Sequence, residues 1–175
     1  ALLIVTQACA IHCRYCFRRN FDYQDNLLGP KQWQPAFDYL RKNSTLTEVI
    51  LSGGDPLAAN DKHLTWLSNQ LKLIPHVARL RIHSRLPIVL PHRINQPLLD
   101  WLADWPGQKV MVVHCNHANE INQEVKIAID KLRSAGVTVL NQSVLLAGIN
   151  DSVSALTELS ESLFDTHVLP YYLHT

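Results

Sequence analysis

Three cysteines lie within eight residues near the start of the chain. Cys9, Cys13 and Cys16 have the spacing C-x3-C-x2-C. Three thiolates on one short loop can hold three irons of a 4Fe–4S cluster and leave the fourth iron without a protein ligand. An open iron is a position where a substrate or a second cofactor can bind. The spacing therefore predicts an iron–sulfur centre with an open site.

A structural zinc site is the alternative for the same cysteines, because a C-x2-C pair is often one half of such a site. Zinc would need a fourth ligand, which His12 or Cys115 could supply. His114 and His117 could be core histidines or a metal pair with the spacing H-x2-H, but only Glu120 is a nearby acid, which makes zinc a weak prediction there. The three-cysteine spacing favours the cluster, and Cys115 is then expected at a strand end beside the site.

Two arginines follow the cysteines. A guanidinium binds a carboxylate through two parallel hydrogen bonds. Arg18 lies two residues beyond Cys16, so we expect it to bind a substrate carboxylate beside the cluster. For Arg19, a solvated surface arginine is an equally good interpretation.

Apolar strand-like runs alternate with amphipathic helical stretches along the chain. The predicted strands cover residues 2–6, 47–52, 78–83, 109–114, 137–145 and 167–172. Continuous apolar runs, such as Val110 to Val113, favour a parallel sheet buried on both faces. Between them, apolar residues at helical spacing predict helices that face the core, the first of them opened by Pro30. The pattern predicts an α/β fold, a partial (β/α)6 barrel with parallel strands.

Polar residues recur where the predicted strands end, which is where chemistry gathers in β/α barrels. After the cysteine loop these are Ser52-Gly53-Gly54-Asp55-Pro56, His83-Ser84-Arg85, His114-Cys115-Asn116-His117 and Asn141-Gln142-Ser143. Glycines let a backbone approach a ligand closely, although Gly-Gly-Asp-Pro alone could be an ordinary turn. Other histidines, among them His63, His76 and His92, are expected on the surface.

Composition excludes several classes of protein. The 175 residues include 16 basic and 15 acidic ones, a net charge of +1 that favours neither nucleic acid nor membrane partners. No apolar run reaches the ~18 residues of a membrane span. Four cysteines, three of them at metal spacing, indicate a reducing cytoplasm. Because both ends fall on strands expected to be buried, we predict that residues 1–175 are one core domain truncated at both ends.

Taken together, these residues resemble the lysine 2,3-aminomutase family of radical S-adenosylmethionine (SAM) enzymes. The matching stretches are Cys9 to Arg19, Leu51 to Leu57, Ser84 to Pro87, Asn116 to Glu120, Asn141 to Leu146, Asn150-Asp151 and Pro170 to Tyr172. The variant Arg81 to Val89 is most similar to the bacterial member that makes (R)-β-lysine for attachment to elongation factor P.

The resemblance implies roles for particular residues. Cys9, Cys13 and Cys16 would ligate the 4Fe–4S cluster, and Arg18 would pair with the substrate α-carboxylate. The residues implied to contact SAM are Ser52, Gly53, Gly54 and Asp55 at its methionine part, and His114 and Gln142 at its adenosyl part. The family also uses pyridoxal phosphate (PLP) bound to a lysine, which the resemblance places outside this chain.

The implied activity is transfer of the α-amino group of L-lysine to its β-carbon, in the cytoplasm. Flavodoxin or ferredoxin would be the reductant, and a homo-oligomer is compatible with the resemblance. Two alternatives stay open: a catabolic lysine or glutamate 2,3-aminomutase, and a non-catalytic iron–sulfur or zinc protein.

Overall fold

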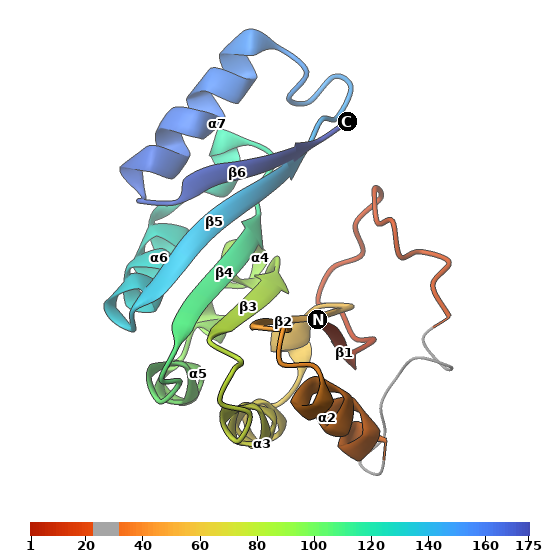
Figure 1. Cartoon of the computed structure of the whole chain (residues 1–175). Coiled ribbons are helices and arrows are strands. Elements are labelled where there is room, and N and C mark those ends of the chain that lie inside the picture. Colours follow the sequence, from red (N-terminus) through yellow and green to blue (C-terminus); the bar gives the residue numbers. More distant parts are fainter. Residues whose placement is uncertain (23–31) are drawn as a thin grey trace.

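The computed structural model describes residues 1–22 and 32–175, so Pro30 lies outside the described residues. In these residues, six strands alternate with helices (Figure 1). The strands are β1 (Leu2–Thr6), β2 (Glu48–Gly53), β3 (Arg79–Ser84), β4 (Gln108–His114), β5 (Val137–Val144) and β6 (Leu169–His174). The helices are α2 (Trp33–Lys42), α3 (Asp61–Lys72), α4 (Leu86–Val89), α5 (Gln96–Ala103), α6 (Gln123–Ser134) and α7 (Val153–Asp165), with 3-10 turns η1 (Pro56–Ala58), η2 (Pro91–Arg93) and η3 (Ala118–Glu120).

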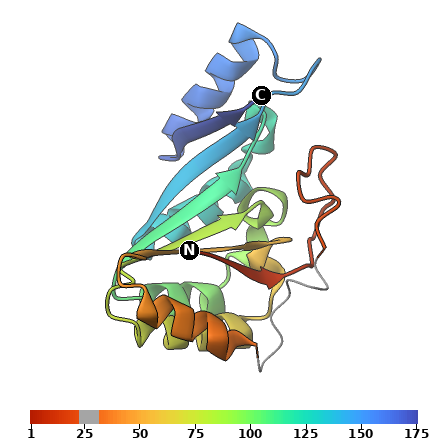
Figure 2. The same ribbon diagram turned by 45° about the vertical axis from the view of Figure 1, so that its right-hand side comes forward.

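The strands form one parallel sheet in the order β1-β2-β3-β4-β5-β6, so each strand pairs with the next one along the chain. Parallel neighbours need crossover connections, which the helices provide. The helices cover one face of the twisted sheet, and β1 and β6 lie at its two separate edges (Figures 1 and 2). The predicted parallel partial barrel is confirmed, and the predicted strand ends agree to within two residues.

Short polar side chains begin α3, α5, α6 and α7, whereas α2 has no side-chain cap. Asn60, Asn95, Asn122 and Ser152 each accept a backbone N–H from the first turn of α3, α5, α6 and α7. Gly136 follows α6 with a φ of +77°, as expected of a glycine just beyond a helix C-terminus. These local signals mark where α3, α5, α6 and α7 start and where α6 stops.

The hydrophobic core lies between the helices and one face of the sheet. Burial alternates along β3: Leu80 and Ile82 are buried under the helices, whereas Arg81 and His83 are half-buried on the opposite, inner face. The prediction of a sheet buried on both faces is therefore wrong for β3, whereas the consecutive residues Met111, Val112 and Val113 of β4 are all buried. The physical reason is that the inner face of β3 carries polar and charged side chains, which stay near solvent or pair with one another.

The last strand also departs from expectation. The end strand was expected to be buried, but all six residues of β6 are exposed. The reason is that β6 pairs only with β5, at the edge of the sheet. Its exposed side chains include Leu169, Tyr171, Tyr172 and Leu173.

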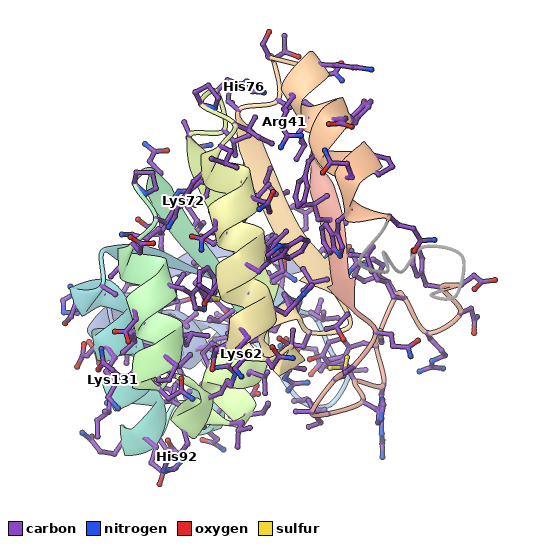
Figure 3. The ribbon with its side chains drawn as sticks, turned by 90° about the horizontal axis from the view of Figure 1, so that it is seen from below. Arg41, Lys62, Lys72, His76, His92 and Lys131 are labelled. Atoms are coloured by element: carbon purple, nitrogen blue, oxygen red, sulfur yellow. The ribbon has the colours of Figure 1, made fainter. Side chains whose placement is uncertain are left out.

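Two of the three histidines expected on the surface are half-buried. His76 Nε2 lies 3.0 Å from the Leu40 carbonyl oxygen, and His63 stacks on Trp66, whereas His92 is exposed (Figure 3). Among the helices that the structure describes, none has the length and apolar character that a membrane span requires.

Candidate functional site

The end of β2 packs directly against the chain that enters the cysteine loop. Gly54 N donates to Thr6 O at 2.7 Å, and Asp55 N donates to Ala8 O at 2.8 Å. A Cβ on Gly54 would lie 2.4 Å from Ala8 O, and one on Gly53, whose φ is +128°, would lie 2.4 Å from Thr6 O. The two glycines therefore permit backbone-to-backbone contact that no larger residue allows.

The three cysteines share one loop after β1. Cys16 N donates to Cys13 O at 3.1 Å, which closes a turn between them. Burial raises the pKa of the Cys9 thiol, and the nearby Asp55, Cys16 and Cys13 raise it further. In residues 1–22 and 32–175, no three cysteine, histidine or carboxylate side chains already converge as ligands of a metal ion. The loop thus brings the three thiols within electrostatic range of one another without a formed coordination geometry.

Arg18 reaches from the cysteine loop to the end of β2. Its Nη1 donates to Ser52 Oγ at 2.7 Å and to Gly53 O at 2.8 Å, and its guanidinium lies over the Phe17 ring. The structure thus brings Arg18 to two of the residues implied to contact SAM. Arg19 is exposed and donates instead to the carbonyl oxygen of Arg14 within the loop.

Asp55 is buried and bound by protein groups. Its carboxylate accepts hydrogen bonds from Leu57 N at 3.0 Å, Ser84 Oγ at 2.7 Å, Arg85 N at 2.8 Å and Leu86 N at 3.3 Å. Burial raises the pKa of the Asp55 carboxyl, and these hydrogen bonds oppose the rise. Asp55 therefore ties the end of β2 to the end of β3, and its contact with SAM stays a prediction.

The ends of β4 and β5 place the two residues implied to contact the adenosyl part of SAM side by side. His114 and Gln142 are register partners, and Gln142 Nε2 lies 3.2 Å from His114 Nδ1. Burial lowers the pKa of His114 to about 3, and the neighbouring His83, Arg85, His174 and Arg18 lower it further. His114 is therefore a neutral group at physiological pH.

Cys115, a candidate zinc ligand, is fully buried. Its Sγ donates to His117 O at 3.3 Å, and burial raises its pKa to about 12. Asn141 holds its backbone from both sides, accepting from Cys115 N at 2.9 Å and donating to Cys115 O at 3.0 Å. The protonated thiol is poorly suited to bind a metal. His12, the other candidate, is exposed on the cysteine loop.

Arg85 is the residue whose role the sequence did not reveal. It stands directly after β3, and its Nη1 donates to Cys13 Sγ at 3.1 Å while its Nη2 donates to Glu120 Oε2 at 3.0 Å. The guanidinium lies over the Tyr15 ring, with 5.6 Å between Cζ and the ring centroid. The only signal was the position of Arg85 at a strand end, which does not show what its side chain reaches.

Similarity to known proteins adds to this geometry. Residues 1–77 match the family model of the 4Fe–4S single cluster domain. The chain is 52% identical over 174 residues to the L-lysine 2,3-aminomutase of Escherichia coli K12 and 52% identical over 173 residues to that of Haemophilus influenzae. Each alignment covers 99% of this chain and 51% of the relative. Over nearly its whole length the chain is therefore similar to L-lysine 2,3-aminomutases. It spans about half the length of these relatives.

More distant comparisons agree with this similarity. The L-lysine 2,3-aminomutase of Clostridium subterminale is 41% identical over 174 residues, which cover 99% of this chain and 42% of that protein. The structure of coproporphyrinogen III oxidase (HemN) from Escherichia coli, described as a radical SAM enzyme, matches with a TM-score of 0.63. The match covers 100% of this chain and 44% of that one at 13% identity, so it shows the fold alone.

The residues present fit the cofactors that the family implies. Three free thiols on one loop are the donor set of an open 4Fe–4S cluster, and the Arg85 guanidinium at Cys13 complements the negative charge of a thiolate-bound cluster. Polar groups at the ends of β2, β4 and β5 lie on the same edge of the sheet as this loop.

Proposed function

We propose that the whole protein is a radical SAM aminomutase that converts L-lysine to (R)-β-lysine. One observation carries the proposal: Arg18, two residues beyond the last cysteine, joins the cysteine loop to Ser52 and Gly53 at the carboxyl end of β2. A cation suited to an amino-acid carboxylate thus stands beside the residues suited to a radical source. The 52% identity to an L-lysine 2,3-aminomutase supports lysine as the substrate.

In this proposal each residue has a stated part. Cys9, Cys13 and Cys16 hold the cluster, and Arg18 binds the substrate α-carboxylate. The residues proposed to line SAM are Ser52, Gly53, Gly54, Asp55, His114 and Gln142. When bound, the reduced cluster and SAM supply an organic radical, and PLP supplies the electron sink for the migrating nitrogen.

Arg18 can bind a carboxylate without leaving its place. Its Nη1 is engaged by Ser52 and Gly53, whereas its Nε and Nη2 donate no hydrogen bond to any other described residue. Two parallel donors on one guanidinium match the two oxygens of a carboxylate. Arg18 would therefore orient the amino acid through its carboxylate.

Neutral histidine suits the adenosyl part of SAM. Because His114 is uncharged at physiological pH, it adds no positive charge beside the sulfonium of SAM. Gln142 holds the imidazole against the end of β5. We infer that this pair positions the nucleoside by hydrogen bonds and packing and limits the access of water.

The finer parts of the proposal rest on the resemblance of Arg81 to Val89. We propose that the product serves modification of elongation factor P, in the cytoplasm, with flavodoxin or ferredoxin as reductant. The PLP lysine is proposed to lie outside residues 1–175, and these residues to form the radical SAM core domain.

The test uses the whole protein, purified anaerobically, reduced, and supplied with SAM and PLP. L-Lysine labelled with 15N at the α-amino group should give β-lysine in which NMR detects the labelled nitrogen bound to the β-carbon. Chiral chromatography should identify the R enantiomer. A matched incubation with labelled glutamate serves as the substrate control.

Each alternative has its own outcome. Conversion of glutamate without conversion of lysine would assign a glutamate aminomutase. A colourless protein that contains zinc and leaves SAM intact would overturn the catalytic proposal. If lysine is converted, the modification of elongation factor P is then measured in cells that lack the protein. Unmodified elongation factor P supports the proposed role, and unchanged modification would assign a catabolic one.

A further inference from the structure

Arg85 connects the cysteine loop to the polar ends of two strands. It follows β3, reaches Cys13 Sγ through Nη1 at 3.1 Å, and reaches Glu120 Oε2 through Nη2 at 3.0 Å. Cys13 and Arg85 are 72 positions apart in the sequence. The guanidinium therefore bridges a proposed cluster ligand and a carboxylate that follows β4.

Both ends of this arginine are fixed. Its backbone N–H donates to Asp55 Oδ2 at 2.8 Å, which anchors the main chain. Its partner Glu120 is fixed as well, because Glu120 Oε1 accepts from Asn116 N at 2.7 Å and from His117 N at 3.1 Å. The guanidinium thus has little freedom to leave Cys13.

Tyr15 and burial complete the surroundings. The Tyr15 ring lies against the guanidinium, and its hydroxyl accepts from Asn116 Nδ2 at 2.8 Å. The Arg85 side chain is only 18% exposed, and its Nε is buried without a hydrogen-bond partner among the described residues. Charge at this depth is weakly screened, so its effect on a neighbouring thiolate is large.

We propose that Arg85 is a positioning residue that donates a hydrogen bond to the Cys13 sulfur of the 4Fe–4S cluster and thereby raises the reduction potential of the cluster. The physical reason is that reduction adds negative charge to the cluster, which an N–H donor and a positive charge at a ligand sulfur stabilise. Glu120 holds the guanidinium in the required orientation. The inference rests on the proposed function only in requiring that Cys13 bind the cluster.

The chain offers a matched control. Arg93 is also a half-buried arginine, with its Nη2 2.7 Å from Asp61 Oδ1 and its side chain 13% exposed. Its other contacts are to Leu57 O, Ala59 O and Asn95 Oδ1, with no cysteine among them. Arg93→Gln therefore removes a comparable buried ion pair without touching the cysteine loop.

The experiment compares the reconstituted whole protein with Arg85→Gln, Arg85→Lys and Arg93→Gln. Iron content and an EPR-monitored redox titration are measured without SAM. At a fixed potential, Arg85→Gln should show at least a tenfold lower ratio of reduced to oxidised cluster, equivalent to about 59 mV for one electron. Arg85→Lys, which keeps the charge but cannot hold both partners, should show a smaller decrease, and Arg93→Gln should match the parent.

A second readout begins with the parent protein, whose result does not depend on how well the variants fold. In protein labelled with 15N-arginine, the reduced cluster of the parent and of Arg93→Gln should show a 15N coupling by pulsed EPR, and Arg85→Lys should lose it. A parent without that coupling, or an Arg85 variant with the parent's potential, overturns the proposal. A parent that binds no iron would instead overturn the proposed function.

Discussion

Arg18 and Arg85 show how one residue type can take different tasks within a single site. Arg85 has both terminal nitrogens engaged by Cys13 and Glu120, whereas Arg18 engages only Nη1 with Ser52 and Gly53. Arg85 keeps an unpartnered Nε among the described residues, but this atom is buried, whereas the parallel Nε and Nη2 donors of Arg18 remain for a ligand. This difference supports the proposed ligand-binding part of Arg18 and the proposed positioning part of Arg85.

The first prediction concerns the cysteines. Replacing Cys9, Cys13 or Cys16 singly by alanine should abolish SAM cleavage and remove most of the bound iron, because each removes one of three thiolate ligands. Cys115→Ala should keep its iron and lose about 1 kcal/mol of stability, since it deletes a buried thiol. Iron analysis and urea unfolding measure both effects. Equal iron loss in Cys115→Ala and Cys13→Ala would contradict the three-ligand site.

The second prediction concerns Arg18. Arg18→Lys keeps the charge but loses the two-pronged geometry, so lysine turnover should fall by about 10- to 100-fold. Iron content and SAM cleavage without substrate should stay near the parent's values. The assay needs the whole protein. A variant that loses its cluster would instead make Arg18 part of the loop structure.

At the scale of elements, the junction of β1 with β2 decides where the cysteine loop stands. Gly54 lies so close to Gln7 and Ala8 that the chain entering the cysteine loop packs directly against the end of β2. The strand ends are then tied sideways, because Asp55 binds Ser84 and the backbone of Arg85. Each crossover helix only has to bring the next strand into register for these contacts to form.

The third prediction follows from this junction. Gly54→Ala would place a Cβ 2.4 Å from Ala8 O and 2.5 Å from Gln7 O, so the backbone must shift. We expect a loss of about 1–3 kcal/mol and weaker iron retention. Gly148→Ala is the control, because nothing lies within 4 Å of its Cβ and only its φ of +71° is strained, at about 1 kcal/mol. Normal iron in Gly54→Ala would argue against a tight junction.

The fourth prediction concerns the inner face of β3 and β4. Burial lowers the pKa of His83 to about 4 and that of His114 to about 3. The unfolded state therefore binds more protons below the ordinary histidine pKa of about 6.5. The free energy of unfolding therefore keeps its full value above that pH and decreases as the pH falls towards the folded-state pKa values of the two histidines. The urea concentration at the unfolding midpoint should fall as the pH is lowered from about 7 to about 4.5. This fall should be smaller in a His83→Gln, His114→Gln double variant. An unchanged slope in that variant would contradict the assignment.

At the scale of the whole molecule, the sheet is open. The exposed apolar residues of β6 and the half-buried polar residues of the inner face lie on surface that the described helices do not cover. The helices cover the other face, and Lys62, Lys72 and Lys131 lie on that outer layer (Figure 3). The other described lysines are Lys42, Lys109 and Lys126, at the end of α2, in β4 and in α6.

The fifth prediction uses this distribution of lysines. The described lysines lie on helices or near the start of β4, and none of their described hydrogen bonds or ion pairs reaches the cysteine loop, so we expect none of them to bind PLP there. Borohydride reduction of the PLP-loaded whole protein, followed by mass spectrometry, should therefore find the pyridoxyl group on a lysine outside residues 1–175. The prediction extends to Lys31, which lies outside the described residues. A group fixed specifically on any lysine of this chain would contradict it.

The sequence by itself determined the cysteine spacing, the alternation of strands and helices, and the polar character of the strand ends. Each of these is written in residues that are close together in the chain, so periodicity and motif spacing reveal them. Only the tertiary structure decided that the inner face of β3 is polar and half-exposed and that Asp55 binds the end of β3. It also decided that Arg85 reaches a cysteine 72 positions away. Such contacts depend on strand register and crossover geometry, which set the distances between side chains that the sequence leaves far apart.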